Sequence, residues 1–468
     1  MIEKTVLRRI AAAAIAAAIL GGAHIGAART AEISGLGDEA VKLLQQYVRV
    51  DTVNPPGNEA RAADFFARIF DAEGIPYSRV ESAPGRANIW ARLKGGAAPA
   101  LLLLNHTDVV PADASQWSVD PLSGVIRDGY IYGRGALDMK SGGILELLAF
   151  LTLHRSGQVL NRDVVFLATA DEEAGGLFGA GWLVKNRPQL FRHVAFALNE
   201  GGVGTRIRGR EVFTVEVTQK IPLWLRLSVT DEPSHGSQPH VTSSVVRLIE
   251  ALYRIRSQAF GARMVPAVDR YFKALAALET GARRADFANM DKAIRRPGFL
   301  EDLHKTSPFY YALTRDTCAI TRLAGSNKIN VVPSTATAEL DCRLLPDRTP
   351  ENFIRALRSR LADPGIKIRR LMAFSPAIST TDTALYRAIE SVISQRRPGA
   401  VVVPGVTTGF TDSHFLRDLG IPAYGFMPLV LGADERRGIH GNNERISVDG
   451  LKRAADLFYQ VVARVAHE

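Results

Sequence analysis

The sequence predicts an α/β domain interrupted by a smaller α+β insertion. Its 468 residues exceed one typical domain, so two domains are expected. Short apolar, β-rich runs alternate with helical patterns in the first half, and such runs return near the C-terminus. Between them, strands alternate apolar with polar residues, which is typical of a half-exposed antiparallel sheet. We therefore expect one domain from residues 32–219 and 375–468, with an insertion at residues 220–374.

Each expected element has a pattern of its own. Continuous apolar runs predict buried strands at 101–104, 164–168, 194–198, 401–403 and 423–427. Apolar residues at helical spacing predict helices at 143–154, 179–185, 245–255 and 350–362. Two-residue alternation predicts strands at 224–229 and 335–343. The stretch from about 260 to 325 is charged and has no regular period, so we expect it to be irregular.

The composition excludes several classes of protein. A hydrophobic fraction of 46% and a charged fraction of 23% are those of a globular chain, not of a disordered, collagen-like or coiled-coil one. The two cysteines, Cys318 and Cys342, allow at most one disulfide, and their spacing matches no thiolate metal site.

The chain is basic, with 58 Lys and Arg against 48 Asp and Glu. Residues 1–31 contribute +3 of the net +10, and the remaining +7 is scattered in short pairs such as Arg283-Arg284 and Arg436-Arg437. No aromatic residues interleave these pairs, and no nucleic-acid motif is present. We expect a solvated basic surface and no nucleic-acid partner.

The N-terminus is typical of a secretory signal peptide at residues 1–31. Lys4, Arg8 and Arg9 precede an apolar run over 10–22, and small residues follow, so cleavage is expected after Ala28 or Ala31. A retained membrane anchor is the weaker alternative, because the run is shorter than the about 20 apolar residues that span a bilayer. The mature protein is expected in the periplasm or outside the cell, without stable membrane insertion.

Polar residues follow three of the expected buried strands directly. The carboxyl ends of strands share one edge of an open α/β sheet, so these side chains are expected to converge: His106, Asp108, Glu172, Glu173 and Glu200. Taken singly, each has an ordinary interpretation, since an Asp at a helix start is commonly an N-cap and a loop His is commonly surface. Together with Asp138 and His440, which lie in glycine-flanked loops, they form the mixed imidazole and carboxylate set that zinc prefers.

These residues occur in motifs that resemble a known family. The motifs are His106-x-Asp108, Gly135-Ala-Leu-Asp138-Met-Lys140, Asp171-Glu172-Glu173, Asn199-Glu200-Gly201 and His440. Their order and spacing are similar to those of the di-zinc metallopeptidase and deacylase family that contains aminoacylase, carboxypeptidase G, carboxypeptidase S and succinyl-diaminopimelate desuccinylase. The resemblance covers residues 40–465 and implies a mixed-sheet zinc-exopeptidase catalytic domain with an inserted α+β lid and dimerisation domain.

The resemblance also implies roles for the motif residues. One zinc ion would be held by His106, Asp138 and Glu200, and the other by Asp138, Glu173 and His440, with cobalt and manganese as alternative metals. Asp108 would orient His106. Glu172 would be the general base, although a role as a further metal ligand is the alternative.

Residues of the expected insertion would complete the site. His235 would stabilise the oxyanion, reaching across a homodimer interface, while Asn330 and Arg343 would bind the free carboxylate of the substrate. Met139 stands where many relatives have Asp or Asn, and the family usually has a cis peptide after the bridging aspartate. The segment 409–414 lacks the usual arginine before His414, which leaves His414 either behind the site or on the surface.

The resulting hypothesis is a zinc-dependent hydrolase of the carboxypeptidase or aminoacylase type. It would cleave the amide bond of a small peptide or N-acyl-amino acid next to a free C-terminal carboxylate. The alternatives are an aminopeptidase or dipeptidase of the same family, and a catalytically silent exported relative that binds peptides. A Gly-x-Ser-x-Gly elbow and a His-Glu-x-x-His helix are both absent from the sequence, and Gly202-Val-Gly204 lacks the third glycine of a dinucleotide loop.

Overall fold

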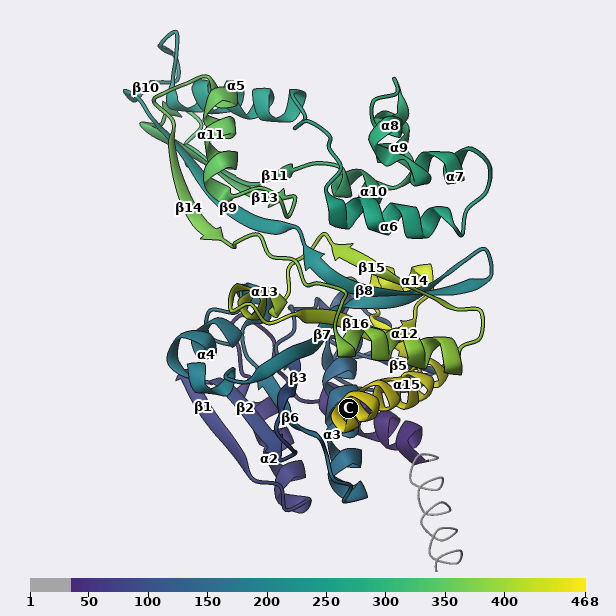
Figure 1. Cartoon of the computed structure of the whole chain (residues 1–468). Helices are drawn as coiled ribbons and strands as arrows, with labels where there is room; N and C mark the ends of the chain where they lie inside the picture. Colours follow the sequence, from purple (N-terminus) through teal and green to yellow (C-terminus); the bar gives the residue numbers. More distant parts are fainter. Residues whose placement is uncertain (1–34) are drawn as a thin grey trace, which may run out of the picture. The chain divides into compact units, whose positions relative to one another are not determined.

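The computed structural model describes residues 35–468, so the predicted signal peptide at 1–31 lies outside the described residues. The described chain divides into two compact units, residues 35–179 with 431–468, and residues 180–430 (Figure 1). None of the helices in the described part has the length and apolarity needed to cross a membrane.

The first unit is built on a mixed set of strands. Its neighbouring strands, in spatial order, are β1 (Tyr77–Ala83), β2 (Arg86–Leu93), β6 (Arg162–Thr169) and β3 (Ala98–His106). Strands β2 and β6 are antiparallel, whereas β3 and β6 are parallel. A small sheet of the same unit contains β17 (Arg445–Ser447), β5 (Tyr130–Tyr132) and β4 (Ile126–Arg127). Leu101 to Leu104 of β3 are fully buried, as their continuous apolar run predicts.

Helices cover the strands of the first unit. They are a helical segment at 35–48, α2 (Ala60–Ala72), α3 (Lys140–Ser156), α14 (Ala433–Gly438) and α15 (Val448–His467), with the short helices η1 (Ala114–Gln116) and η2 (Glu172–Ala174). Helix α3 is buried from Lys140 to Leu153, and α15 packs against it (Figure 1). Burial on all sides explains why α3 is apolar around its whole circumference rather than along one stripe.

The second unit contains a further mixed set of strands. In spatial order they are β7 (Val194–Ile207), β16 (Ala423–Val430), β8 (Arg210–Gln219) and β15 (Val401–Thr407). Strand β16 runs parallel to β7, β15 runs parallel to β8, and β7 and β8 form an antiparallel hairpin. The accompanying helices are α4 (Ala180–Asn186), η3 (Pro188–Leu190), α12 (Ala384–Arg396) and α13 (Ser413–Asp418).

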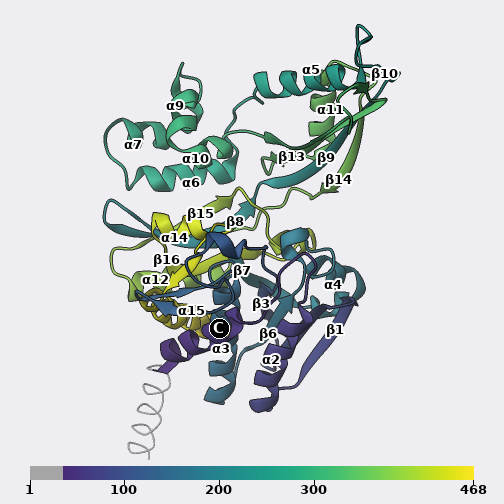
Figure 2. The same cartoon turned by 180° about the vertical axis from the view of Figure 1, so that it is seen from behind.

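An antiparallel sheet of the second unit occupies most of the predicted insertion. Its order is β11 (Thr317–Ala324), β13 (Thr335–Leu344), β9 (Ile221–Thr230) and β14 (Lys367–Ala373), and a short ribbon pairs β10 (Ser234–His235) with β12 (Val331–Val332). Helices α5 (Ser244–Ser257) and α11 (Pro350–Leu361) pack on one face (Figure 2). Cys318 and Cys342 lie opposite each other on β11 and β13 and form the one disulfide that the sequence allows.

The stretch predicted to be irregular is helical, so that prediction was wrong. It forms α6 (Pro266–Ala276), α7 (Gly281–Ala288), α8 (Met290–Ala293), α9 (Phe299–Thr306) and α10 (Pro308–Leu313). The longest of these, α6, has only 11 residues, and proline or glycine interrupts the stretch repeatedly, so no long helical period develops. Their apolar side chains pack with Val212 of β8 and Val403 of β15, outside the predicted insertion. The insertion at 220–374 therefore stays a prediction as a domain.

Candidate active site

The first unit brings together six of the residues predicted from the motifs. His106 is the last residue of β3, and Asp108 follows two residues later. Asp138 immediately precedes Met139, the N-cap of α3, and Glu172 and Glu173 form the start of η2, just beyond β6. His440 follows α14 in a loop where its backbone φ is 57°. Four separate chain segments thus converge as the strand-end argument predicts.

Asp138 lies between two imidazoles. Its Oδ1 is 3.2 Å from Nε2 of His106, and its Oδ2 is 3.1 Å from Nε2 of His440. The same His440 nitrogen is 3.2 Å from Oε2 of Glu173. One ligand atom from each of Asp138, Glu173 and His440 lies within 4.8 Å of the others, so a single cation between them would be within reach of all three. Imidazole nitrogen with carboxylate oxygen is the donor set of zinc sites, so these residues fit a metal ion.

The charges of this cluster favour a bound cation. Burial raises the pKa of Glu173, and the nearby Asp138 carboxylate raises it further. Burial also opposes ionisation of Asp138, but hydrogen bonds with His106 and His440 outweigh it and lower the pKa of that carboxyl. Hydrogen bonds to Asp138 and Glu173 raise the pKa of His440 to about 10. The carboxylates therefore draw positive charge to this position.

Asp108 orients both sides of the cluster. Its backbone carbonyl accepts a hydrogen bond of 3.0 Å from Nδ1 of His106, which fixes the ring with Nε2 3.2 Å from Oδ1 of Asp138. Its carboxylate accepts the backbone N–H groups of Glu172 and Glu173 at 3.0 and 3.1 Å. The family resemblance implied that the Asp108 carboxylate would orient His106, whereas the backbone carbonyl receives that hydrogen bond. The carboxylate instead holds the Glu172-Glu173 turn in place.

Glu172 lies beside the cluster without joining the two imidazoles as Asp138 does. Its side chain is buried, and Oε2 is 4.0 Å from Nε2 of His106. Its role as general base stays a prediction.

Glu444 is a functional residue that the sequence interpretation missed. Its buried carboxylate accepts the backbone N–H groups of Gly135, Leu137 and Asp138 at 2.9, 2.7 and 3.1 Å, and Arg134 donates to it at 2.7 Å. Glu444 thereby fixes the loop that carries Asp138. The available signal was its position four residues after His440, within the same loop.

Met139 replaces the hydrogen-bonding residue expected after Asp138. Its side chain is buried, and its sulfur accepts the backbone N–H of His106 at 3.3 Å. The Asp138–Met139 peptide bond is cis, as the family resemblance implies.

The remaining predicted residues lie in the second unit. Glu200 is half-buried in β7, and its role as a metal ligand stays a prediction. Arg343 on β13 donates through Nε and Nη2 to Asp341 at 2.7 and 2.9 Å, and its buried Nη1 has no partner among the described residues. The guanidinium also lies 5.4 Å from the ring centre of Phe410.

His235 and Asn330 are neighbours and are both exposed. Gly236, next to His235, donates its backbone N–H to the carbonyl of Asn330 at 2.8 Å. The backbone N–H of Ser237 donates to Nδ1 of His235 at 3.2 Å, and the Ser237 hydroxyl lies 2.8 Å from the same nitrogen. The role of His235 as an oxyanion-stabilising residue stays a prediction.

Comparison with known proteins identifies the family of this chain. The model of the peptidase family M20/M25/M40 matches residues 102–464. The chain belongs to this family. It is 33% identical over 374 residues to the N-fatty-acyl-amino acid synthase/hydrolase PM20D1 of Xenopus tropicalis, covering 77% of this chain and 71% of that protein. It is 28% identical over 439 residues to aminoacylase-1 of Sus scrofa, covering 91% and 95%.

Solved structures of the family share the fold. The M20 family metallo-carboxypeptidase Sso-CP2 of Sulfolobus solfataricus superposes with a TM-score of 0.72 at 21% identity, covering 92% of this chain and 99% of that one. Human carnosine dipeptidase 1 gives a TM-score of 0.67 at 18% identity, covering 93% and 98%. This M20 chain is accordingly a hydrolytic, metal-binding enzyme with the family's mixed α/β fold.

His414 of the M20 chain is buried, so the surface alternative was wrong. Only 3% of it is exposed, and its ring stacks 3.5 Å from that of Phe374. Nδ1 pairs with the carbonyl of Thr411 at 3.0 Å. Burial lowers the pKa of His414 to about 3, so this imidazole is neutral at physiological pH.

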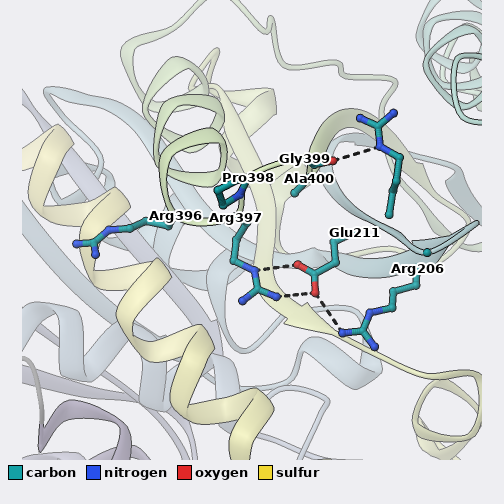
Figure 3. A pocket seen from close by; sticks show the side chains of 9 residues that line it. Arg206, Glu211, Arg396, Arg397, Pro398, Gly399 and Ala400 are labelled. Atoms are coloured by element: carbon teal, nitrogen blue, oxygen red, sulfur yellow. Dashed lines mark hydrogen bonds and ion pairs between the residues drawn. The ribbon is translucent and has the colours of Figure 1, made fainter.

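A hollow of about 700 Å³ in the second unit has four arginines among its nine lining residues (Figure 3). Arg397 binds Glu211 through two hydrogen bonds of 2.8 and 2.5 Å, and Arg206 approaches Glu211 at 3.4 Å, whereas Arg396 extends away from them (Figure 3). Its lining includes none of the predicted catalytic residues, so the chemistry of the M20 chain is expected elsewhere.

Proposed function

We propose that this M20 enzyme hydrolyses the amide bond of an N-acyl-amino acid or small peptide next to a free C-terminal carboxylate. The observation that carries the proposal is the arrangement of Asp138 between His106 and His440, with Glu172 alongside. The N-acyl-amino acid class is supported by the relatives, one named as an N-fatty-acyl-amino acid synthase/hydrolase and another as an aminoacylase.

Two zinc ions are the proposed cofactors, with cobalt or manganese as alternatives. His106, Asp138 and Glu200 would hold one ion, and Asp138, Glu173 and His440 the other. When bound, the ions would polarise the scissile carbonyl and make a water molecule more acidic.

Glu172 would manage the proton in this reaction. Its carboxylate would accept a proton from the attacking water and return it to the nitrogen of the leaving amine. Asp108 keeps Glu172 in position, because it holds the backbone N–H of Glu172 at 3.0 Å. A buried carboxylate held in this way loses little freedom when substrate binds.

Arg343 would select substrates with a free carboxylate. Asp341 fixes the guanidinium through Nε and Nη2, and the unpartnered Nη1 remains to bind an anion. An unsatisfied buried donor is costly, so a substrate carboxylate at this position would be stabilised.

His235 and Asn330 would reach the active site of a second copy in a homodimer. Arg343 pairs with Pro222 at one end of β9, while β10 and β12 follow beyond Thr230, at the other end. The eight steps from Pro222 to Thr230 span roughly 26 Å at the usual rise per residue, too far for one small substrate to contact both in one copy.

An exposed apolar stripe supports the homodimer. Val246, Ile249 and Tyr253 lie on one face of α5, and Leu323 lies on the edge strand β11. Such a stripe beside an open strand edge suits a self-complementary contact between two copies.

Export to the periplasm or the outside of the cell is also part of the proposal. The signal-like N-terminus supports it, and the Cys318–Cys342 disulfide is of the kind that persists in oxidising compartments.

A substrate panel tests the proposed reaction. Purified enzyme is given N-acetyl-, N-octanoyl- and N-palmitoyl-amino acids, their C-terminal amides, and unblocked dipeptides, and released amine is measured. We expect release from the free acids, loss of activity with a chelator and recovery with zinc. Equal cleavage of the amides and the free acids would contradict the carboxylate requirement. Cleavage of unblocked peptides alone would identify an aminopeptidase or dipeptidase instead.

A further inference from the structure

A second pocket in the second unit lies away from Arg343. Its volume is about 360 Å³, and it is bounded by the end of α5, by α9 and α10, and by β11. Its lining includes Ile255, Phe260, Tyr311, Arg315 and Ile320.

The pocket and Arg343 are on opposite faces of the antiparallel sheet. Thr317 pairs with Arg343, and the next residue, Cys318, pairs with Cys342. Successive side chains of a strand point to opposite faces, so Cys318 and Ile320 point away from the Arg343 side, toward α5. The pocket is therefore not a part of the proposed substrate site.

Arg315 is a buried arginine without a counter-ion. Only 7% of it is exposed, its Nε is buried without a partner, and no hydrogen bond or ion pair links its guanidinium to any residue in the described part of the chain. The guanidinium lies flat over Tyr311, 4.2 Å from the ring centre. Burial lowers the pKa of Arg315, which means that its charge is held at a cost.

The neighbouring carboxylate, Asp316, is not the counter-ion of Arg315. Asp316 binds Arg263 at 3.2 Å and Arg348 at 2.6 Å. It also accepts the backbone N–H of Leu345 at 2.8 Å. Two arginines thus share Asp316, and Arg315, adjacent in sequence, has none.

The walls of the pocket indicate the chemistry of the part of the ligand that does not contact Arg315. Ile255 and Phe260 are buried core side chains, and Ile320 is exposed. Together they offer an apolar surface beside the unpaired Arg315, and the exposed Arg256 adds a second positive charge to the lining. We propose that this pocket binds an amphiphilic carboxylate, with its anionic end on Arg315 and its aliphatic chain against Ile255, Phe260 and Ile320. A single planar carboxylate matches a guanidinium fork, and the volume suits a ligand of the size of a medium-chain fatty acid.

Calorimetric titration of the metal-loaded full-length enzyme with octanoate tests this site. We expect octanoate to bind, and its affinity to fall by at least about tenfold in Arg315→Gln, because a charge-assisted hydrogen bond is lost. Arg322→Gln is the matched control, since Arg322 is an exposed arginine on β11 paired with Glu339. Arg343→Ala separates the two sites, and it should leave octanoate affinity unchanged.

Other probes and variants decide between occupants. Octanol should bind more weakly than octanoate, and inorganic phosphate should not compete; if phosphate binds as tightly as octanoate, the site takes small anions only and the proposal fails. Ile320→Glu places a negative charge on the exposed part of the pocket wall, where it would repel the octanoate carboxylate and abolish binding. This second variant keeps the test decisive if Arg315→Gln does not fold. Octanoate affinity equal to that of the wild type in both Arg315→Gln and Ile320→Glu would overturn the proposal. The proposal would also fail if octanoate did not bind the wild type and Arg315→Gln converted a dimer into monomers, since a second copy would then supply the counter-ion of Arg315.

Discussion

His440 in the first unit and His414 in the second experience opposite surroundings. Two carboxylates, Asp138 and Glu173, lie 3.1 and 3.2 Å from His440 and raise its pKa to about 10. His414 stacks on Phe374 and Phe415, and burial lowers its pKa to about 3. Both are single histidines in polar segments of the sequence, and apart from the family pattern that includes His440, only their neighbours in the structure distinguish them.

The difference shows how this enzyme separates chemistry from packing. Positive charge is favoured beside Asp138, whether it is a proton or a metal ion, because carboxylates surround it. Beside Phe374 any charge is unfavourable, so His414 acts as an aromatic ring with one hydrogen bond. Substitutions should therefore affect turnover in the first environment, and chiefly stability in the second.

The largest effect is expected from removing a charge in the carboxylate cluster. Glu172→Gln keeps the shape but removes the base, so kcat should fall by about 10²- to 10⁴-fold while metal content is unchanged. Steady-state kinetics and metal analysis of the same preparation measure both. Glu81→Gln, an exposed glutamate of β1 paired with Arg79, is the control and should keep full activity. Undiminished turnover in Glu172→Gln would remove Glu172 from the mechanism.

A smaller effect is expected at Arg343, a charge that Asp341 already satisfies in part. Arg343→Ala should raise KM by roughly 10- to 100-fold for substrates with a free carboxylate, because one charge-assisted contact is lost. The measurement is KM and kcat for an N-acyl-amino acid and for its amide. Arg322→Ala, on the neighbouring strand β11, should change neither. An equal loss on the amide would refute carboxylate binding.

The smallest effect on activity is expected at His414, where the readout is stability. The unfolded chain binds a proton there near pH 6.5, whereas the folded protein does so only near pH 3. Between these two pH values the unfolded state therefore holds more protons than the folded state. The free energy of unfolding should fall as the pH is lowered through this range, by up to about 1.4 kcal/mol per pH unit.

Urea unfolding of the wild type and of His414→Phe at several pH values between about 7 and 5 isolates this contribution. The stability advantage of the wild type over the variant should shrink as the pH is lowered, because phenylalanine does not titrate. His240→Gln removes an exposed histidine and serves as the reference. A difference that is constant with pH would show that His414 is not held neutral.

Much of the candidate site could be predicted because it depends on strand ends. His106 and Glu173 follow continuous apolar runs, which predict buried strands. Because these neighbouring strands are parallel, their carboxyl ends lie at one edge of the sheet. The spacing of Asp138 and His440 then completed a family pattern. The strand ends are local features of the sequence, and the order of the motifs repeats that of a known family.

Other features depend on contacts between distant segments. In the sequence, Glu444 cannot be distinguished from a solvated glutamate. Its role depends on the backbone N–H groups of Gly135, Leu137 and Asp138, which lie more than 300 residues away in sequence. The state of His414 depends on Phe374, which lies 40 residues upstream. The short helices α6 to α10 escaped prediction because tertiary packing, and not a long period, stabilises them.

The loop that follows α14 has a consequence for how the enzyme is made. It contributes His440 to the cluster and, through Glu444, clamps the distant loop that carries Asp138. Glu444 follows Asp138 by 306 residues in the sequence. A nascent chain can complete its early strands, but it cannot assemble this cluster until residues 440–444 have been synthesised. We therefore expect a chain truncated before residue 438 to lack both His440 and Glu444 and to have no hydrolytic activity.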